Sequence, residues 1–427
     1  MLSLPHAELW LALIVVVSIL LMLVRARNIP EVYWIAAGVC LLLVFRLEPF
    51  GNAVGAAKKG IDVYLFLIGM MLLSELSAKH GVFDWLSSEA VRHAQGSTAR
   101  LFLLVYGAGT VVTIFMSNDA TAVVLTPAIL AAVRKARIEP LPYLFVCAFI
   151  ANAASFVLPI SNPANLVVFH KDMPALGRWL MQFGVPSILS VVVTYGVLHW
   201  KFRRELRSGI EGKVEEVQFL HDHGKLMLGG LLATAVVLLI ASALNWDLGL
   251  PTCLTALAVT TIVSTWSRTN PLPLFRHISW STLGLVAGLF VMVDAVERFG
   301  AMRYTQKWLE WAGRLGAATG AAIVGLVVGV ANNLVNNLPL GLIAGSTMQA
   351  AQTRGLMASA VLIGVDLGPN LSITGSLATI LWLIALRKEK LDVSFWSFLK
   401  IGGIAMPLAL LCSLLSAIAM QACFGIQ

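Results

Sequence analysis

The stretch I-F-M-S-N-D-A-T-A-V-V-L-T-P, residues 114–127, decides how this chain is organised. It is an apolar run whose centre carries four polar side chains, Ser117, Asn118, Asp119 and Thr121. Charged and amide side chains are costly at membrane depth, so they are rare there and usually mark a pathway for substrate or ions. The stretch therefore predicts a functional site, provided that the chain around it lies in a membrane.

The composition is that of a membrane protein. Of the 427 residues, 58% are hydrophobic and 12% are charged, and the mean hydropathy is +0.84. A soluble domain is nearer half apolar and a quarter charged. Apolar segments long enough to cross a bilayer recur along the whole chain, which predicts an all-α polytopic membrane protein. The longest polar stretch, residues 201–225, is too short for a soluble domain.

The charge and the cysteines argue against several classes of function. The net charge is +8, but most Lys and Arg residues lie in short loops between apolar segments, a pattern that sets membrane orientation and does not indicate nucleic acid. The five cysteines are far apart and form no CxxC motif, so neither a zinc site nor a disulfide framework is expected. Without a phosphate-binding loop or Walker lysine, we expect no cofactor, no ATP hydrolysis and no enzymatic activity.

The first half, residues 1–200, carries a hairpin and a broken helix between plain membrane helices. Basic residues flank residues 101–133 on both sides, which predicts a hairpin that enters and leaves by the cytoplasmic face. Residues 142–170 are too long for one helix, and Pro159 and Pro163 each remove a backbone donor. Such a break is typical of a discontinuous helix that faces a ligand. Plain helices are expected at 8–24, 30–47, 61–76 and 183–200, and an interfacial helix at 83–95.

The second half, residues 226–427, repeats this order after a cytoplasmic linker at 201–225. Its hairpin is expected at 315–352 and its broken helix at 356–386. The charge pattern places the start of the first half outside the membrane and the start of the second half inside it. We therefore predict an inverted-topology repeat. This gives about ten transmembrane helices, two re-entrant hairpins and two broken helices, with both termini in the periplasm. Plain helices are expected at 226–244, 250–266, 280–296 and 399–423, and an interfacial helix at 301–314.

The second hairpin has its own polar tip, V-A-N-N-L-V-N-N-L-P, residues 330–339. Buried amides must be hydrogen-bonded, and each offers both donors and acceptors. We expect Asn336 and Asn337 to contact a ligand, while Asn332 and Asn333 could instead cap a half-helix. The two tips lie about 218 positions apart, which sets Asn337 opposite Asp119 in the repeat.

Candidate site residues gather at the two tips and the two breaks, because inverted repeats place the substrate near mid-membrane. The plainer alternatives are a loop or a helix cap at the first tip, helix capping at the first break, and, for Asp366, a structural pair with an asparagine or a backbone end. Asp119 and Asp366 are the proton-coupling candidates, since a carboxylate at low dielectric can alternate between its charged and neutral forms. For Asn152, helix packing and a site role stay open, and Cys147 is expected in the core. The substrate-binding candidates are Ser117, Asn118, Asp119, Thr121, Ser161, Asn162, Asn165, Asn336, Asn337, Thr374 and Ser376.

Four motifs resemble those of the ArsB-type arsenite/antimonite efflux permeases of the ion transporter superfamily. They are M-S-N-D-A-T-A-V-V-L-T-P (116–127), I-S-N-P-A-N-L-V (160–167), N-N-L-P (336–339) and G-V-D-L-G-P-N-L-S-I-T-G-S-L-A-T-I-L-W-L (364–383). The resemblance implies proton-driven export of arsenite and antimonite across the bacterial inner membrane, an elevator-like transport domain and, in some members, a soluble ATPase subunit. The chain departs from that family at Asn152, where an acidic residue is frequent, and at Asn370, where a lysine is frequent.

Arsenite near neutral pH is an uncharged trihydroxide, and the amides of the tips and breaks supply the donors and acceptors that it needs. Two other classes stay open. A sodium-coupled carboxylate or anion carrier, or a sodium/proton antiporter, would use the same amides, hydroxyls and freed carbonyls. An intramembrane enzyme is a weaker alternative, because no catalytic motif surrounds the aspartates. The sequence leaves open the coupling stoichiometry, a homodimer and the docking of an ATPase subunit.

Overall fold

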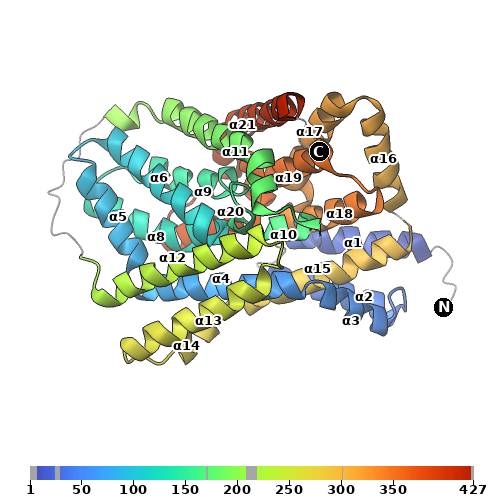
Figure 1. The fold of residues 1–427 in the computed structure, drawn as a ribbon, viewed down its shortest axis with the longest axis horizontal. Coiled ribbons are helices and arrows are strands. Elements are labelled where there is room, and N and C mark those ends of the chain that lie inside the picture. Colours follow the sequence, from blue (N-terminus) through green and yellow to red (C-terminus); the bar gives the residue numbers. More distant parts are fainter. Residues whose placement is uncertain (1–6, 25–28, 170–171, 208–218, 301, 425–427) are drawn as a thin grey trace.

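The computed structural model describes residues 7–24, 29–169, 172–207, 219–300 and 302–424. These residues form helices joined by short turns and no strand, which confirms the predicted all-α polytopic architecture (Figure 1). The two terminal segments and residues 208–218, the middle of the expected linker, lie outside the described residues.

Within the described part of the chain, eight helices are long and apolar enough to span a bilayer. They are α4 (Ile61–Lys79), α6 (Thr98–Met116), α11 (Leu176–Lys201), α12 (Asp222–Ala243), α13 (Gly249–Trp266), α15 (Trp280–Arg298), α17 (Ala317–Val335) and α21 (Phe395–Phe424). Four shorter apolar helices are α1 (Ala7–Val24), α2 (Glu31–Val44), α9 (Leu141–Ala153) and α19 (Gly355–Leu367). The others are α3 (Phe50–Lys59), α5 (Val82–His93), α7 (Asn118–Ala120), α8 (Thr126–Lys135), α10 (Pro163–Phe169), α14 (Leu272–His277), α16 (Met302–Arg314), α18 (Asn337–Ala350) and α20 (Leu377–Lys388).

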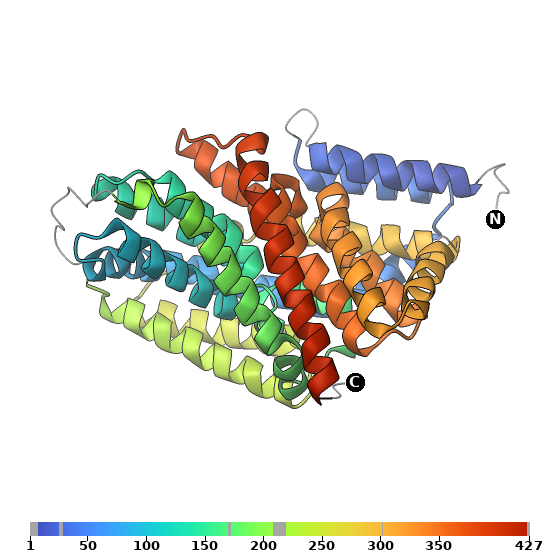
Figure 2. The same ribbon diagram turned by 90° about the horizontal axis from the view of Figure 1, so that it is seen from above.

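Helices from the two halves of the chain pack directly on one another. α4 lies along α13, and both run beside α12 across the lower part of the molecule (Figure 1). α11 lies along α21 through the middle of the second view (Figure 2). The two halves therefore share one core, and the polar tips and breaks lie within it.

Small residues let α17 and α19 approach closely. A Cβ atom on Gly364 would lie 2.7 Å from the carbonyl oxygen of Gly325, which is closer than a real Cβ atom can come. Close backbone approach at glycine is a common way for membrane helices to associate. This close approach brings α17 of the second hairpin against α19, the helix that carries Asp366.

The segment before Ile61, where the sequence predicts no helix, contains the helix α3. Ala53 and Ala56 of α3 pack against Val291 of α15. Lys59 donates to Asp294 at 2.6 Å, and Arg298 donates to the other oxygen of the same carboxylate at 2.6 Å. The local sequence gave little sign of this helix, because its stability depends on contacts with a helix more than 200 residues away.

Glu48, in the turn before α3, lies beside this ion-paired group. Its carboxylate is buried, with Oε1 3.7 Å from Nε of Arg298. Burial raises the pKa of Glu48, and the neighbouring Arg298 opposes that shift. The group fixes α3 to the end of α15.

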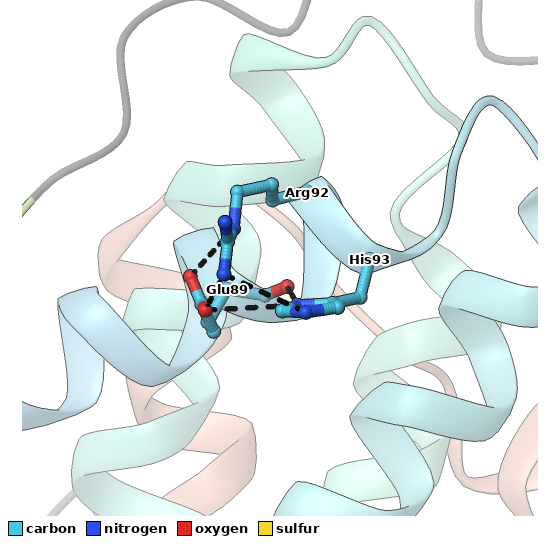
Figure 3. A network of polar contacts seen from close by, with 3 residues as sticks. All are labelled: Glu89, Arg92 and His93. Carbon is cyan, nitrogen blue, oxygen red and sulfur yellow. Dashed lines mark hydrogen bonds and ion pairs between the residues drawn. The ribbon is translucent and has the colours of Figure 1, made fainter.

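The amphipathic segment expected at 83–95 forms α5. Figure 3 shows its polar face, where Arg92 pairs with Glu89 and His93 lies against the same turn. The ring of His93 contacts the carbonyl oxygen of Glu89 at 3.0 Å. Phe83 and Ala90 are buried on the other face. One polar and one apolar face suit a helix at an interface, as predicted.

Candidate functional site

The two hairpin tips share an unusual backbone conformation. Ser117, between α6 and α7, has φ 100° and ψ 159°, and Asn336, between α17 and α18, has φ 80° and ψ 152°. This region of φ/ψ space is essentially reserved for glycine and costs about 1–3 kcal/mol per residue. Such strain clusters at ligand sites and switch regions. Backbone strain, as well as the polar side chains, therefore indicates a functional role for the two tips.

The shared conformation sets the correspondence between the tips. Ser117 and Asn336 are 219 positions apart. Asn118 therefore corresponds to Asn337, and Asp119 corresponds to Leu338. The expected pairing of Asp119 with Asn337 is wrong by one position, because the polar residues alone did not reveal which residue turns the chain.

Ser117→Gly should raise the free energy of unfolding by about 1 kcal/mol, since glycine adopts this conformation without strain. Thermal melting of the purified protein in detergent would measure the change. The control is Ala120→Gly, where the backbone is helical (φ −60°, ψ −42°) and glycine should instead destabilise by about 1 kcal/mol. A lower melting temperature for Ser117→Gly would contradict strain at this tip.

Both long helices break as predicted, and each break ends in a capped half-helix. Between α9 and α10 the chain makes a 3-10 turn at Pro159–Ser161, and Oδ1 of Asn162 then accepts from the amide of Ala164 at 3.0 Å. Between α19 and α20 it makes two 3-10 turns, and Oγ of Ser376 accepts from the amide of Thr379 at 3.1 Å. The predicted capping alternative thus describes one role of Asn162, and Ser376 has the same role at the second break.

The two breaks bond to each other across the repeat. Nδ2 of Asn162 donates to Oδ1 of Asp366 at 2.8 Å. Nδ2 of Asn152 donates to Oδ1 of Asn370 at 3.0 Å and to Oγ1 of Thr379 at 3.3 Å. All five side chains are buried. The polar network therefore couples the helix before one break to the segment after the other.

Asn152 and Asn370 are the two positions at which the chain departs from the resembled permeases. The structure places them in direct contact, and Nδ2 of Asn370 also donates to the carbonyl oxygen of Phe149 at 3.0 Å. One amide donates to the other here, and no charge is involved. The two positions that differ from the resembled permeases are thus the two members of one buried pair.

The second tip is bonded closely to the second break. Asn333 donates to the carbonyl oxygen of Gly368 at 3.1 Å and accepts from Oγ of Ser372 at 2.7 Å. Oγ1 of Thr374 donates to the carbonyl oxygen of Asn333 at 3.1 Å, and Nδ2 of Asn336 donates to that of Thr374 at 3.2 Å. Asn333 and Ser372 were not predicted as site residues, because their role depends on the tip meeting the break.

The first hairpin is bonded to the first break by the hydroxyl of Ser161, whose Oγ donates to the carbonyl oxygen of Ile114 at 3.0 Å. Thr121 bonds instead within the hairpin, to Thr113 at 2.8 Å. Residues 121–125 form a π-helical turn, an irregularity that is frequent at functional sites. It precedes Pro127, which has no amide hydrogen for the helix ladder.

Asn165 has a different place from its predicted neighbours. Its Nδ2 donates to the carbonyl oxygen of Ser155 at 2.9 Å and also reaches those of Leu158 and Pro159. These bonds satisfy carbonyls that the break releases, so Asn165 holds the break together. Thr379 also belongs to the network, through its bonds with Asn152 and Ser376, and the sequence did not indicate it.

Several buried oxygens at the tips and breaks accept no hydrogen bond from any described residue. They are Oδ1 of Asn118, Asn152, Asn165, Asn332 and Asn337, and Oδ2 of Asp366. Buried polar atoms are normally paired, and unpaired ones need an explanation. Among the described residues, no Lys or Arg donates into this network. The site therefore offers acceptors to a ligand that brings donors or positive charge.

A wide cavity of about 2090 Å³ approaches the site from one end. Its lining includes Leu166–Phe169 of α10, Leu342 and Gly345 of α18, and the carboxylates Asp62 and Asp294. The polar network lies at the opposite, N-terminal ends of α10 and α18. The cavity thus leads toward the site without reaching the tip residues.

The described residues contain no group of three or more His, Cys, Asp or Glu side chains that could hold a metal ion. Cys147 is buried and unpaired, as expected for a core thiol. The chemistry of the site therefore rests on amides, hydroxyls and the carboxylates of Asp119 and Asp366.

The chain is similar in sequence to arsenical pump membrane proteins. It is 25% identical over 369 residues to that of Yersinia enterocolitica, covering 83% of this chain and 85% of the relative. It is 26% identical over 375 residues to that of Escherichia coli strain K12, covering 84% and 86%. A further Escherichia coli relative of the same name is 23% identical over 426 residues, covering 96% and 98%. These relatives confirm the resemblance to the ArsB-type permeases.

The fold is similar to that of the YdaH transporter of Alcanivorax borkumensis, with a TM-score of 0.61 at 14% identity over 99% of both chains. The two proteins thus share a fold. A family model described as "Citrate transporter" (CitMHS) matches residues 7–365, and the chain therefore belongs to the CitMHS family of transporters.

Proposed function

We propose that this protein is a secondary active transporter that exports trivalent arsenite and antimonite from the bacterial cytoplasm, driven by the proton gradient. The substrate would bind between the two tips and the two breaks. The names of the arsenical pump relatives support this substrate. The family description points to citrate instead, so the chemistry of the site has to decide between the two.

The unpaired acceptor oxygens carry the proposal. Arsenous acid is neutral and presents three hydroxyl donors, which match oxygens such as Oδ1 of Asn118, Oδ1 of Asn337 and Oδ2 of Asp366. Citrate is a polyanion, and its carboxylates would need donors or positive charge in their place. Buried oxygens without donors would repel it.

Asp119 and Asp366 are the proton carriers in this proposal. Asp366 is fully buried, and one oxygen accepts from Asn162 while the other has no partner among the described residues. Asp119 is half-buried, and no described side chain forms an ion pair with it. Both groups can therefore gain or lose a proton without breaking a salt bridge.

The architecture suits alternating access. We propose that residues 1–200 and 226–427 form the inverted repeat, joined by the linker at 201–225, and that an elevator-like movement carries the tips and breaks. The cavity is lined by chain segments that the charge pattern assigns to the periplasmic side, among them those at Lys59, Asp172, Asp247, Glu297 and Arg354. The cavity would be the periplasmic exit.

The test is arsenite accumulation in inverted membrane vesicles, in sodium-free buffer, with a proton gradient imposed and then collapsed. We expect uptake that disappears when the gradient is collapsed. No uptake of arsenite or antimonite under either condition would contradict the proposal. Citrate uptake in the same vesicles would then support the function that the family description suggests.

A sodium-coupled carrier is the second candidate. The same acceptor oxygens suit an alkali cation, since hard cations prefer oxygen ligands. A sodium gradient imposed in the same vesicles, without a proton gradient, separates the two. Uptake that requires sodium would favour the second candidate and leave the architecture unchanged.

A further inference from the structure

One side of α17 can approach α19 closely because it carries small residues at helical spacing. Gly325, Gly329 and Asn332 follow each other at intervals of four and three residues, which places them on the same side of the helix. A Cβ atom on Gly368, at the end of α19, would collide with the carbonyl oxygen of Gly329 and lie 2.6 Å from Nδ2 of Asn332. The glycines therefore leave the space in which the Asn332 side chain reaches the backbone of α19.

Asn332 supplies a hydrogen-bond donor that α19 lacks. In an α-helix the carbonyl oxygen of Val365 would accept from the amide four residues later, but that residue is Pro369, which has no amide hydrogen. Nδ2 of Asn332 donates to this oxygen at 2.7 Å and to the carbonyl oxygen of Gly364 at 2.8 Å. Asn332 is fully buried, in a place where an unpaired carbonyl oxygen is costly. The second hairpin thus completes the last turn of α19.

The two acceptors also fix the orientation of the Asn332 amide. Both are carbonyl oxygens, so the NH2 group, which has a hydrogen for each of them, must face them. Oδ1 of Asn332 then accepts from no described residue. A direct contact between this oxygen and the substrate is the alternative to a role in supporting the backbone.

We propose that Asn332 is a positioning residue for Asp366: it holds the turn of α19 that carries this carboxylate against the first break. The proposal rests on the proposed function for the role of Asp366 in proton coupling. Asp366 directly follows Val365, and its Oδ1 accepts from Nδ2 of Asn162 at 2.8 Å. A turn whose carbonyl oxygens lose their donor opens more readily, which moves Asp366 relative to Asn162.

Asn332→Ala tests the proposal, and Pro369→Ala supplies the rescue. Asn332→Ala should lower the maximal rate of proton-driven arsenite export about 10-fold and change KM less than about 2-fold, because Asn332 acts through Asp366 and not on the substrate. Pro369→Ala returns an amide hydrogen four residues after Val365, so the double variant should export about 5-fold faster than Asn332→Ala alone. A raised KM with an unchanged maximal rate would make Asn332 a substrate contact and overturn the proposal, as would a double variant no faster than Asn332→Ala.

Infrared spectroscopy of the purified full-length protein follows Asp366 without any transport. The band that Asp366→Asn removes belongs to this carboxyl group. It should shift in Asn332→Ala and return toward its native position in the double variant, because the bond to Asn162 changes with the turn. An unchanged band in Asn332→Ala would overturn the proposal. If the native protein exports no arsenite, the proposed function fails, but the infrared comparison still decides whether Asn332 positions Asp366.

The matched control is Ser413→Ala. Oγ of Ser413, on α21, donates to the carbonyl oxygen of Pro186 of α11 at 2.9 Å, so this variant removes another buried hydrogen bond between two helices. It should lower the melting temperature, as Asn332→Ala does, and leave export and the Asp366 band unchanged. A loss of export in Ser413→Ala equal to that in Asn332→Ala would show that any lost bond between helices impairs transport, and would overturn the positioning role.

Discussion

Asp366→Asn should reduce proton-driven arsenite export about 100-fold or more while the protein stays folded, because an amide cannot carry the proton. The substitution keeps the size of the side chain and an oxygen that can accept from Asn162, which donates at 2.8 Å in the native protein. Asp119→Asn should have a similar effect, since Asp119 is the other carboxylate that we propose as a proton carrier. Arsenite accumulation in inverted vesicles with an imposed proton gradient measures both.

Two comparisons separate coupling from folding. Asp222→Asn removes an exposed carboxylate, paired with Lys225 at 2.9 Å, and should leave export unchanged. Arsenite exchange down its own gradient should persist in Asp366→Asn if only the proton coupling is lost. Normal arsenite resistance of cells that carry either Asp119→Asn or Asp366→Asn would refute the assignment of that residue.

Asn370→Lys should destabilise the protein by about 3–5 kcal/mol, because it buries a charge without a partner. Asn370 is fully buried, and its Oδ1 is 3.0 Å from Nδ2 of Asn152. Adding Asn152→Asp should recover part of this loss by supplying an opposite charge at the same contact. Thermal melting of the two single variants and the double variant gives the coupling energy.

The control for this cycle is Asn52→Lys on the surface helix α3, where a charge can reach water and the change should be within about 0.5 kcal/mol. Strictly additive effects of Asn152→Asp and Asn370→Lys would show that the two side chains do not interact. A positive coupling would show that an ion pair and an amide pair can occupy the same buried contact.

The sequence by itself determined the membrane class, the helical fold and the location of the polar tips and breaks. Each of these features is local. Long apolar runs form helices that satisfy their own backbone, and Pro159, Pro163 and Pro369, which lie among Asn and Ser residues, mark the breaks. The motif residues also carried the resemblance to the arsenical permeases that the relatives confirm.

The tertiary structure alone decided which polar residues meet. The bonds of Asn162 with Asp366 and of Asn152 with Asn370 join residues more than 200 positions apart. No local pattern encodes such contacts, because they depend on where the two broken helices cross. The helix α3, the glycine-like conformation of Ser117 and Asn336, and the closer bonding of the second tip likewise follow from the packing of distant segments against each other.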